Sequence, residues 1–236
     1  MARHITLVKM LDMYRAECRM SFNPAHNAQD RDRQVSQLQR VQEWLWEDFN
    51  WPMLRVYRSF PVQKGQRYYS LPADIHIDRI QKVEIFINNV FIAMQPGIGI
   101  EHLSAYNSEL GVEQWPPRRW QISENEQFEV WPISNTDGNE TTLEGTIRIT
   151  ATKLLSPLVA DSDTCDLDGR LITLFAAAEY LASKGDKAAQ LKLDQANKLY
   201  ARLRGAQMPR KRFKMFGIDN SERVERVPFA VYNKPS

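Results

Sequence analysis

A chain of 236 residues with 43% hydrophobic residues can bury a substantial core, and this composition excludes a disordered protein. The formal net charge of +2 is unevenly spread: residues 205–236 hold seven Lys or Arg residues against three acidic ones, so this tail of +4 leaves −2 for residues 1–204. A basic tail on a near-neutral body is typical of an interaction arm whose partner is an acidic protein surface or a nucleic acid.

The first two predicted elements are helices. Apolar residues spaced by three and four predict a helix over residues 5–20. Its inner face is formed by Leu7, Leu11, Tyr14 and Cys18. After a loop at residues 21–27, a second helix is predicted to run to about Asn50, because the residue before Pro52 is pushed out of the helical region. The inner face of this helix is formed by Val35, Leu38, Val41 and Leu45.

A β-rich middle is predicted between residues 54 and 152, because the apolar period changes to the alternation typical of half-buried strands. The predicted strands cover residues 56–60, 66–71, 80–87, 90–94, 118–122, 127–131 and 145–152. Asn88 and Asn89 predict a hairpin turn, since asparagine tolerates the left-handed backbone that such a turn needs. Residues 101–110 are expected to form a short surface helix.

A helical hairpin is predicted after the acidic stretch 161–168. Its first helix is expected to be capped by Asp166 and to end at Gly185, which suits the left-handed position after a helix. The inner face of this helix is formed by Leu171, Leu174, Ala178 and Leu181. The second helix is expected to be capped by Asp186 and to close at Gly205, beyond which three prolines forbid a long helix. Its inner face is formed by Leu193, Ala196, Tyr200 and Leu203.

These elements predict the α+β class, with a helical bundle built from the N-terminal and C-terminal helices, an inserted antiparallel β-sheet domain and an extended C-terminal arm. The expected divisions are an N-terminal helical pair at 1–53, a β-rich platform at 54–153, a C-terminal helical hairpin at 154–204 that packs with the N-terminal helices, and a basic arm at 205–236.

The arm carries two kinds of candidate contact, and its 32 residues could reach roughly 100 Å when extended. Its first part mixes basic and aromatic residues, a pattern that suits phosphate contact with stacking. These residues are Arg210, Lys211, Arg212, Phe213, Lys214 and Phe216. Its last part alternates apolar residues and could add a strand to the sheet edge of another subunit. These residues are Val227, Phe229 and Val231, followed by Tyr232.

Three tryptophans near the end of the second helix exceed what one helix face needs: Trp44, Trp46 and Trp51. They are core residues by default. One or two of them could anchor a subunit interface, because large aromatic side chains dominate the energetics of such interfaces.

No catalytic, metal or cofactor site is predicted. The four histidines lack the spacing of metal ligands. Gly97 and Gly99 lack the third glycine of a dinucleotide-binding loop, so a turn is the better interpretation. The four aspartates between residues 161 and 168 favour a helix-capping role, with a divalent-ion site as the alternative.

The chain is expected to be cytoplasmic when it is made. Cys18 and Cys165 lie far apart without a third cysteine, which predicts two buried free thiols in a reducing compartment. No apolar run is long enough for a signal peptide or approaches the ~20 residues that span a bilayer, so no membrane anchor is expected.

The order of the predicted elements and two sequence steps resemble one known family. The segment from Gly65 to Asp74 (GQRYYSLPAD) leads into the β-rich middle, and the segment from Phe128 to Pro132 (FEVWP) ends a later strand. Together with the N-terminal helices that end in tryptophans and the alanine-rich helix from Leu171 to Gly185, they resemble bacteriophage head-to-tail adaptor proteins. In short-tailed phages these are the tail tubular protein or tail accessory factor.

The resemblance implies a structural virion protein and not an enzyme. Such adaptors form a ring, usually of twelve copies, beneath the portal protein. The ring extends the DNA channel, lets double-stranded DNA pass without sequence specificity, and offers a platform to the next tail protein, the nozzle. The arm is expected to dock on the portal. The protein is expected to be assembled in the host cytoplasm and to end at the portal and tail vertex of the virion.

Two other function classes stay open from the residues alone. A duplex-DNA-binding protein would use the basic segment from Arg202 to Lys214. A hydrolase of cell-wall glycans would need two carboxylates roughly 5 to 9.5 Å apart across a cleft. The candidate pairs are Glu124 with Glu126 and Glu43 with Glu47.

Overall fold

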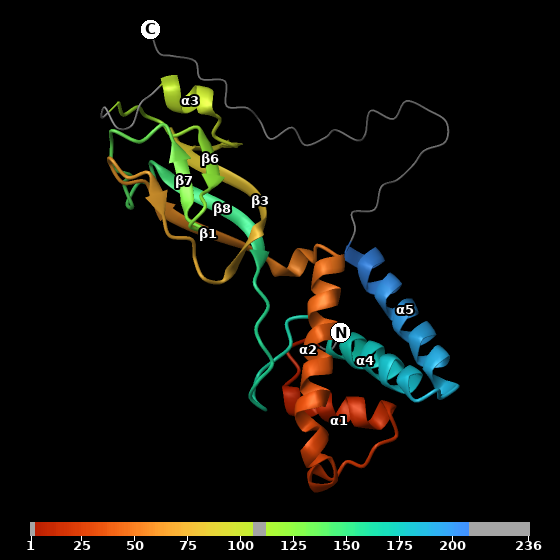
Figure 1. Ribbon diagram of the computed structural model, residues 1–236. Coiled ribbons are helices and arrows are strands. Elements are labelled where there is room, and N and C mark those ends of the chain that lie inside the picture. The colour runs from red at the N-terminus through yellow and green to blue at the C-terminus, as the bar shows by residue number, and fades with distance from the viewer. Residues whose placement is uncertain (1–2, 106–111, 208–236) are drawn as a thin grey trace, which may run out of the picture.

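The computed structural model describes residues 3–105 and 112–207, which form a helical part and a β part arranged end to end (Figure 1). The long helices are α1 (Leu7–Glu17), α2 (Arg31–Asp48), α4 (Gly169–Ser183) and α5 (Ala188–Gln207). Shorter helical segments are η1 (Pro24–Asp30), η2 (Pro52–Leu54) and α3 (Ile100–Ala105). The strands are β1 (Arg55–Pro61), β2 (Tyr68–Tyr69), β3 (Ile75–Ile87), β4 (Val90–Ala93), β5 (Gln95–Pro96), β6 (Arg119–Ile122), β7 (Phe128–Trp131) and β8 (Thr146–Lys153). The predicted α+β class is confirmed.

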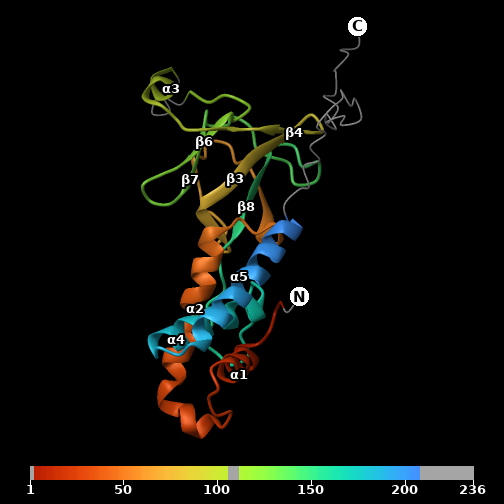
Figure 2. The same ribbon diagram turned by 90° about the vertical axis from the view of Figure 1, so that its right-hand side faces the viewer.

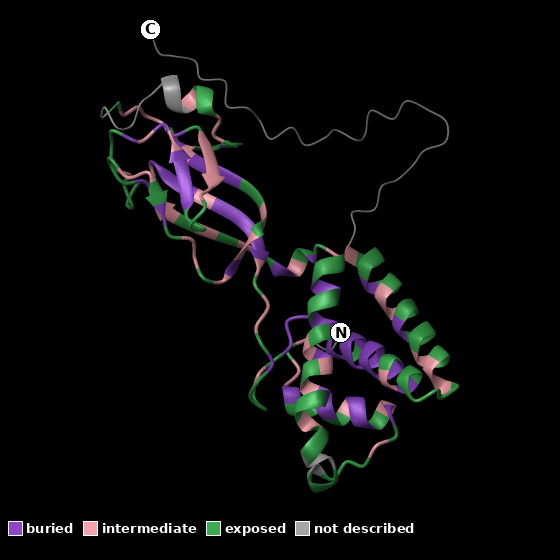
Figure 3. Ribbon diagram, in the orientation of Figure 1, coloured by how far each residue is buried: buried purple, intermediate pink, exposed green. Residues whose placement is uncertain are grey.

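Helix α4 is the centre of the helical part. Residues 171–178 are all buried, because α4 packs against α1, α2 and α5 at once (Figure 3). A helix that is apolar on every side is stable where other elements cover it on every side. The four residues predicted for its inner face are buried, but they are only part of the buried surface.

The outer helices bury one face each. All four residues predicted for the inner face of α1 are buried, and so are three of the four predicted for α2, where Val35 is half-buried. In α5, Ala196 and Leu203 are buried and Tyr200 is half-buried, whereas Leu193 is 37% exposed. The prediction for Leu193 is therefore wrong. At 3.6 residues per turn, Leu193 lies at the edge of the stripe centred on Ala196 and Leu203.

The ends of the C-terminal helices differ from the prediction at two of four positions. Gly185 follows α4 with a φ of +69°, and the Asp186 side chain accepts a hydrogen bond from the backbone N–H of Ala188 at the start of α5, both as predicted. The residue that caps the start of α4 is Asp168, which accepts hydrogen bonds from two backbone amides of the first turn, so the prediction of Asp166 is wrong. Helix α5 continues past Gly205 to Gln207. A single glycine weakens a helix without necessarily ending it.

The β part is a sandwich of two four-stranded sheets, with strand orders β1-β8-β3-β4 and β2-β7-β6-β5. Neighbouring strands are antiparallel except β5 and β6, which are parallel. The two sheets share one apolar core, as expected when two inner faces pack together. Its buried residues are Val62, Tyr69, Ile75, Val83, Ile85, Ile87, Met94, Phe128, Val130, Ile147, Ile149 and Ala151. The sequence predicted seven of the strands, but not β5 or the division into two sheets.

Two loops of the β part were predicted. Asn88 and Asn89 form the turn between β3 and β4, with φ of +51° and +64°. The helix expected at residues 101–110 is α3, which covers Ile100–Ala105. Residues 106–111 lie outside the described residues.

Residues 154–168 lead from β8 back to α4 along α2 (Figure 1). This segment pairs with the N-terminal segment of the chain. The backbone N–H of Leu7 donates to the carbonyl oxygen of Asp163 at 2.8 Å, and Thr6 forms a bridge with Thr164. The start of α1 is therefore held by a segment that follows the whole β part in sequence.

Candidate functional site

The helical and β parts meet around Trp46, at the C-terminal end of α2. The indole Nε1 of Trp46 donates a hydrogen bond to the carbonyl oxygen of Lys153, at the end of β8, at 3.2 Å. Two residues of β3 face the same indole: the Arg79 guanidinium lies 3.9 Å from the ring centroid, and the His76 ring lies 4.9 Å from it. Trp46 thus contacts both central strands of the first sheet.

The carbonyl groups in the last turn of α2 are satisfied by side chains from outside the helix. Arg79 donates to the carbonyl oxygens of Trp46 and Glu47, each at 2.7 Å. The indole Nε1 of Trp51 donates to the carbonyl oxygen of Leu45 at 2.8 Å. Such carbonyls have no partner within the helix, and the helix dipole favours a positive charge beside them. Arg79, a residue of the β part, therefore caps the C-terminal end of α2 in the helical part.

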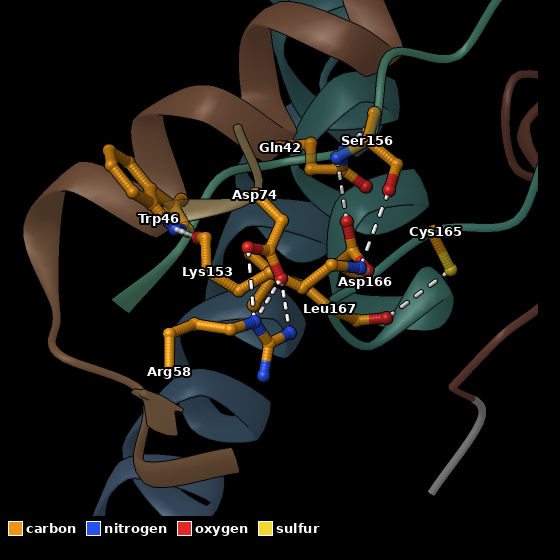
Figure 4. Close-up of polar contacts among 9 residues, drawn as sticks. All are labelled: Gln42, Trp46, Arg58, Asp74, Lys153, Ser156, Cys165, Asp166 and Leu167. Atoms are coloured by element: carbon orange, nitrogen blue, oxygen red, sulfur yellow. Dashed lines mark hydrogen bonds and ion pairs between the residues drawn. The ribbon is translucent and has the colours of Figure 1, made fainter. Parts of the chain in front are cut away.

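Asp166 fixes the connection between β8 and α4 (Figure 4). Its carboxylate accepts hydrogen bonds from Lys153 Nζ at 2.8 Å and from the backbone N–H of Ser156 at 2.7 Å. From α2, Gln42 Nε2 donates to the carbonyl oxygen of Ser156 at 3.4 Å. Because Asp166 is buried, these partners compensate for its lost hydration. Asp166 is therefore a residue of the junction and not the cap of α4.

On the sheet side, the junction is held by an ion pair between Arg58 of β1 and Asp74, just before β3 (Figure 4). Arg58 Nε lies 3.1 and 3.0 Å from the two carboxylate oxygens. These hydrogen bonds hold the pKa of Asp74 below its ordinary value. The carbonyl oxygen of Asp74 also accepts from the backbone N–H of Leu154, directly after β8, at 2.9 Å. Strands β1, β3 and β8 are thus tied together at the end that faces the helices.

The two cysteines are free and buried, as predicted. Cys165 lies beside the junction, where its Sγ donates to the carbonyl oxygen of Leu167 at 3.2 Å (Figure 4). Burial raises the pKa of the Cys165 thiol, and it raises that of Cys18 to about 11. Neither thiol is therefore activated as a nucleophile.

The other aspartates of the acidic stretch also have partners. Asp161 forms an ion pair with Arg31. Asp163 accepts from two backbone N–H groups at 2.8 and 2.7 Å, which hold its pKa below the ordinary value. Asp168 caps α4. Over residues 3–105 and 112–207, no group of three or more Asp, Glu, His or Cys residues is placed to hold a metal ion. These carboxylates organise the loop and the helix start.

Five aromatic residues connect α2, α4 and α5; we call this set the aromatic cluster. The rings follow one another at centroid distances of 5.2, 6.5, 6.2 and 5.0 Å in the order Trp44, Phe175, Tyr200, Trp51 and Phe49. Each successive pair meets edge to face, the geometry that aromatic rings prefer. The cluster therefore joins the C-terminal half of α5 to the end of α2.

The structure places the three candidate interface tryptophans differently. Trp46 and Trp51 are buried within the chain, with their indole nitrogens bonded as described above. Trp44 is 47% exposed, although one edge of its ring packs on Phe175. Of the three, Trp44 has the ring that a neighbouring subunit could contact.

The candidate residues of the arm, from Arg210 to Phe216 and from Val227 to Tyr232, lie outside the described residues. At Gln207, the last residue of α5, the helix has reached the level of the junction (Figure 2). In this last turn the Arg204 guanidinium lies 5.3 Å from the centroid of the Phe49 ring. The last turn of α5 therefore lies beside the junction.

The carboxylate pairs considered for glycan hydrolysis lie on open surface. Glu43 and Glu47 are exposed on α2, and Glu124 and Glu126 are exposed in the turn between β6 and β7. A glycosidase holds its two carboxylates on opposite sides of a cleft that encloses the glycosidic bond. Neither pair has the environment that acid catalysis of glycoside hydrolysis requires.

Comparisons with known proteins identify the family. A search of curated proteins gives no match. Separately, no helix in the described part of the chain is long and apolar enough to cross a membrane. The family model described as SU10 adaptor protein matches residues 14–216. The matched region runs from α1 through the sandwich, the junction and α5 into the first part of the arm. The chain therefore belongs to the SU10 adaptor protein family, a family of structural adaptor proteins of bacteriophages.

Proposed function

We propose that the protein is a head-to-tail adaptor of the tail tubular type, and that twelve copies form a ring beneath the portal of a short-tailed phage. The observation that carries the proposal is the extent of the family match, which includes the basic and aromatic segment from Arg210 to Phe216. This segment follows α5 directly. An adaptor needs a body that meets its neighbours and an element that reaches the portal, and the matched region contains a candidate for each.

The helical parts are the proposed wall of the ring. Copies in a ring meet through two different surfaces, and the contact closes when the rotation per subunit divides the circle. Trp44 is the proposed anchor of this contact. Its ring is already oriented by Phe175, at a centroid distance of 5.2 Å. A neighbour that covers it would gain apolar burial at a small cost in side-chain entropy.

The sandwich is the proposed platform for the next tail protein, the nozzle. It stands at one end of the helical part and is held there by Trp46, Arg79 and Asp166. Because these contacts come from α2, from β3 and from the connection to α4, they resist rotation of one part against the other. A force on the sandwich would thus be transmitted through the junction to the helical part.

The arm, residues 205–236, is the proposed contact with the portal protein. Its charge of +4 favours an acidic surface, and its aromatic residues add apolar area that a small body lacks. Double-stranded DNA is proposed to pass through the ring without sequence specificity. The balance of −2 over residues 1–204 suits this passage, because a dense basic lining would retain the phosphates.

A chain that ends at Gln207 tests the proposal. This truncation removes no described residue, so circular dichroism and the unfolding midpoint should match those of the full chain. Attachment to DNA-filled heads that carry the portal should be lost. As a control, Lys64→Gln with Lys187→Gln removes two charges from exposed positions outside the arm and should keep attachment. Normal attachment of the truncated protein would show that the arm does not dock.

The same pair of proteins tests the alternative of duplex-DNA binding. A DNA-binding arm would give the full chain an affinity for duplex DNA that falls with salt, with a slope of about −0.9 per neutralised phosphate. The adaptor proposal expects weak binding at low salt and similar values for the full and truncated chains. Strong, arm-dependent binding would favour the DNA-binding alternative.

A further inference from the structure

The two sheets have four edge strands in the described part of the chain, and β4 differs from the other three. Strand β1 carries two arginines and ends in a proline, β2 has only two residues, and β5 has two residues of which one is a proline. Charges, prolines and short length all discourage pairing at a sheet edge. Strand β4 has the sequence VFIA, with no charge and no proline.

The backbone of β4 presents hydrogen-bonding groups away from β3. In a two-residue hairpin the two residues that close the turn, here Ile87 and Val90, exchange backbone hydrogen bonds. Hydrogen-bonded pairs alternate with non-hydrogen-bonded pairs along an antiparallel ladder, so the backbone of Ile92 also bonds to β3. In agreement, the backbone N–H of Met94 donates to β3, to the carbonyl oxygen of Val83, at 2.9 Å. The amides of Phe91 and Ala93 therefore point outward, where no strand of the described residues pairs with β4.

The side chains of β4 leave apolar surface at this edge while the strand itself is held in place. Val90 is 40% and Ile92 is 50% exposed, although both lie on the face of the sheet that forms the core. Phe91 lies on the opposite face, 4.8 Å from the Phe86 ring, with the Arg148 guanidinium 3.5 Å from its centroid. The edge is thus preformed and apolar, which is the requirement for strand addition.

We propose that β4 binds residues 227–232 of a second copy of this chain as an added strand. This segment, VPFAVY, has no charge, as β4 has none, and it is bounded by Arg226 and Lys234. If the amides of Val227, Phe229 and Val231 point toward β4, then Pro228 lies where the amide would face solvent. A proline is tolerated there, and it would prevent a further strand from adding.

The length of the arm gives residues 227–232 a long reach from Gln207. The 19 residues between Gln207 and Val227 can span about 65 Å when extended. The inference rests on the proposed assembly of copies, and it divides the arm into two parts. The segment from Arg210 to Phe216, which the family match includes, is left for the portal, and residues 227–232, which lie beyond the match, link neighbouring copies.

Thiol cross-linking in assembled particles tests the inference. Particles are made with a mixture of two single variants, Ala93→Cys and Ala230→Cys, and are treated with a short bis-maleimide. The native thiols of Cys18 and Cys165 are buried, so the parent chain serves as the background. A cross-linked species of twice the chain mass is expected from the mixture. The control mixture combines Ala230→Cys with Tyr57→Cys, which lies on the edge strand β1. In this mixture the cross-linked species should fall to the background.

Two further variants in the Ala93→Cys chain make the test specific. Ile92→Lys places a charge on the half-exposed edge position and should reduce cross-linking at least tenfold with little change in the unfolding midpoint. Ile92→Val should retain cross-linking. Equal cross-linking from Tyr57→Cys would overturn the inference. So would a link found only within one chain, in a protein that carries both Ala93→Cys and Ala230→Cys. Neither result bears on the proposed portal contact, because the segment from Arg210 to Phe216 is unchanged in all of these variants.

Discussion

The guanidinium of Arg79 lies 3.9 Å from the centroid of the Trp46 ring and donates a hydrogen bond to the carbonyl oxygen of the same residue at 2.7 Å. A second donated bond reaches the carbonyl oxygen of Glu47 at 2.7 Å. Arg79 of β3 therefore contacts α2 in two ways, through the Trp46 ring and through two carbonyl oxygens at the end of the helix. Arg79 is therefore one of the residues that hold the sandwich in its orientation to the helices.

We predict that Arg79→Ala lowers the free energy of unfolding by about 2 kcal/mol, because it removes a charged donor from two helix-terminal carbonyls and a cation from the Trp46 ring. Urea denaturation followed by tryptophan fluorescence measures the change. Arg79→Lys keeps the charge but not the forked geometry, so it should recover part of the loss. A stability of Arg79→Ala equal to that of the parent chain would contradict the role given to this residue.

A second prediction concerns the buried carboxylate of the junction. Asp166→Asn should lower the free energy of unfolding by about 1–3 kcal/mol, because the Lys153 ammonium loses its charged partner while Ser156 keeps an acceptor. The matched control is Asp161→Asn, which breaks the more exposed ion pair with Arg31 and should cost less than about 1 kcal/mol. Thermal unfolding of the two variants compares them directly. Equal losses of unfolding free energy in the two variants would mean that the burial of Asp166 does not strengthen its contribution to stability.

The sequence predicted the elements that bury one regular face and failed where partners come from distant segments. The inner face of α1 follows from local periodicity alone. The sequence predicts that strand β3 starts at Ile80, but it starts at Ile75. Its first residues pair with β8 through register shifts, so their apolar and polar side chains do not alternate regularly. Arg79 lies in this irregular stretch. No local signal distinguishes it from an ordinary surface arginine.

The same reason explains the errors at the candidate site. Asp166 and Asp168 are both suitable caps by spacing, and the choice is made by Lys153 and Ser156, which approach Asp166 only in the folded chain. Trp44 and Trp46 are two residues apart and so face directions about 200° apart on a helix. The sequence could therefore predict that one of them is exposed. The position of the β part decides that it is Trp44.

Acid should weaken the β part through Glu84. Burial raises the pKa of Glu84, but hydrogen bonds from Lys82 and Arg148 outweigh this effect, and the net pKa lies below the ordinary value of 4.5. A pKa that is lower in the folded state contributes stability above the unfolded pKa and loses it as the pH falls through the folded pKa. Unfolding free energies measured from pH 6 down to pH 3 should therefore fall.

The variant Glu84→Gln tests the assignment of this acid-sensitive contribution. It removes the titrating group, so the decline below about pH 4.5 should be shallower than in the parent chain. Glu140→Gln, at an exposed loop position, serves as the control and should leave the slope unchanged. An unchanged slope in Glu84→Gln would assign the acid sensitivity to other carboxylates, of which Asp74 is the first candidate because its pKa is also lowered.

Trp44 should matter for assembly in addition to its contribution to folding. Because Trp44 is 47% exposed, Trp44→Ala loses part of the burial of a tryptophan together with its ring contact with Phe175, and should lower folding stability by about 1–3 kcal/mol. If a neighbouring subunit buries the ring, the same change should raise the protein concentration needed for half-maximal ring formation at least tenfold, since a tryptophan at the centre of an interface contributes about 2 kcal/mol or more. Sedimentation velocity with and without portal measures ring formation.

The matched control is Tyr57→Ala, which removes an exposed aromatic side chain from the outer surface of the sandwich and should leave ring formation unchanged. Comparing the two variants separates loss of a specific contact from loss of exposed apolar area in general. Ring formation by Trp44→Ala at the parent concentration would place the subunit contact on another surface of the helical part. Trp46 and Trp51 could not replace Trp44 in that role, because both are already buried within the chain.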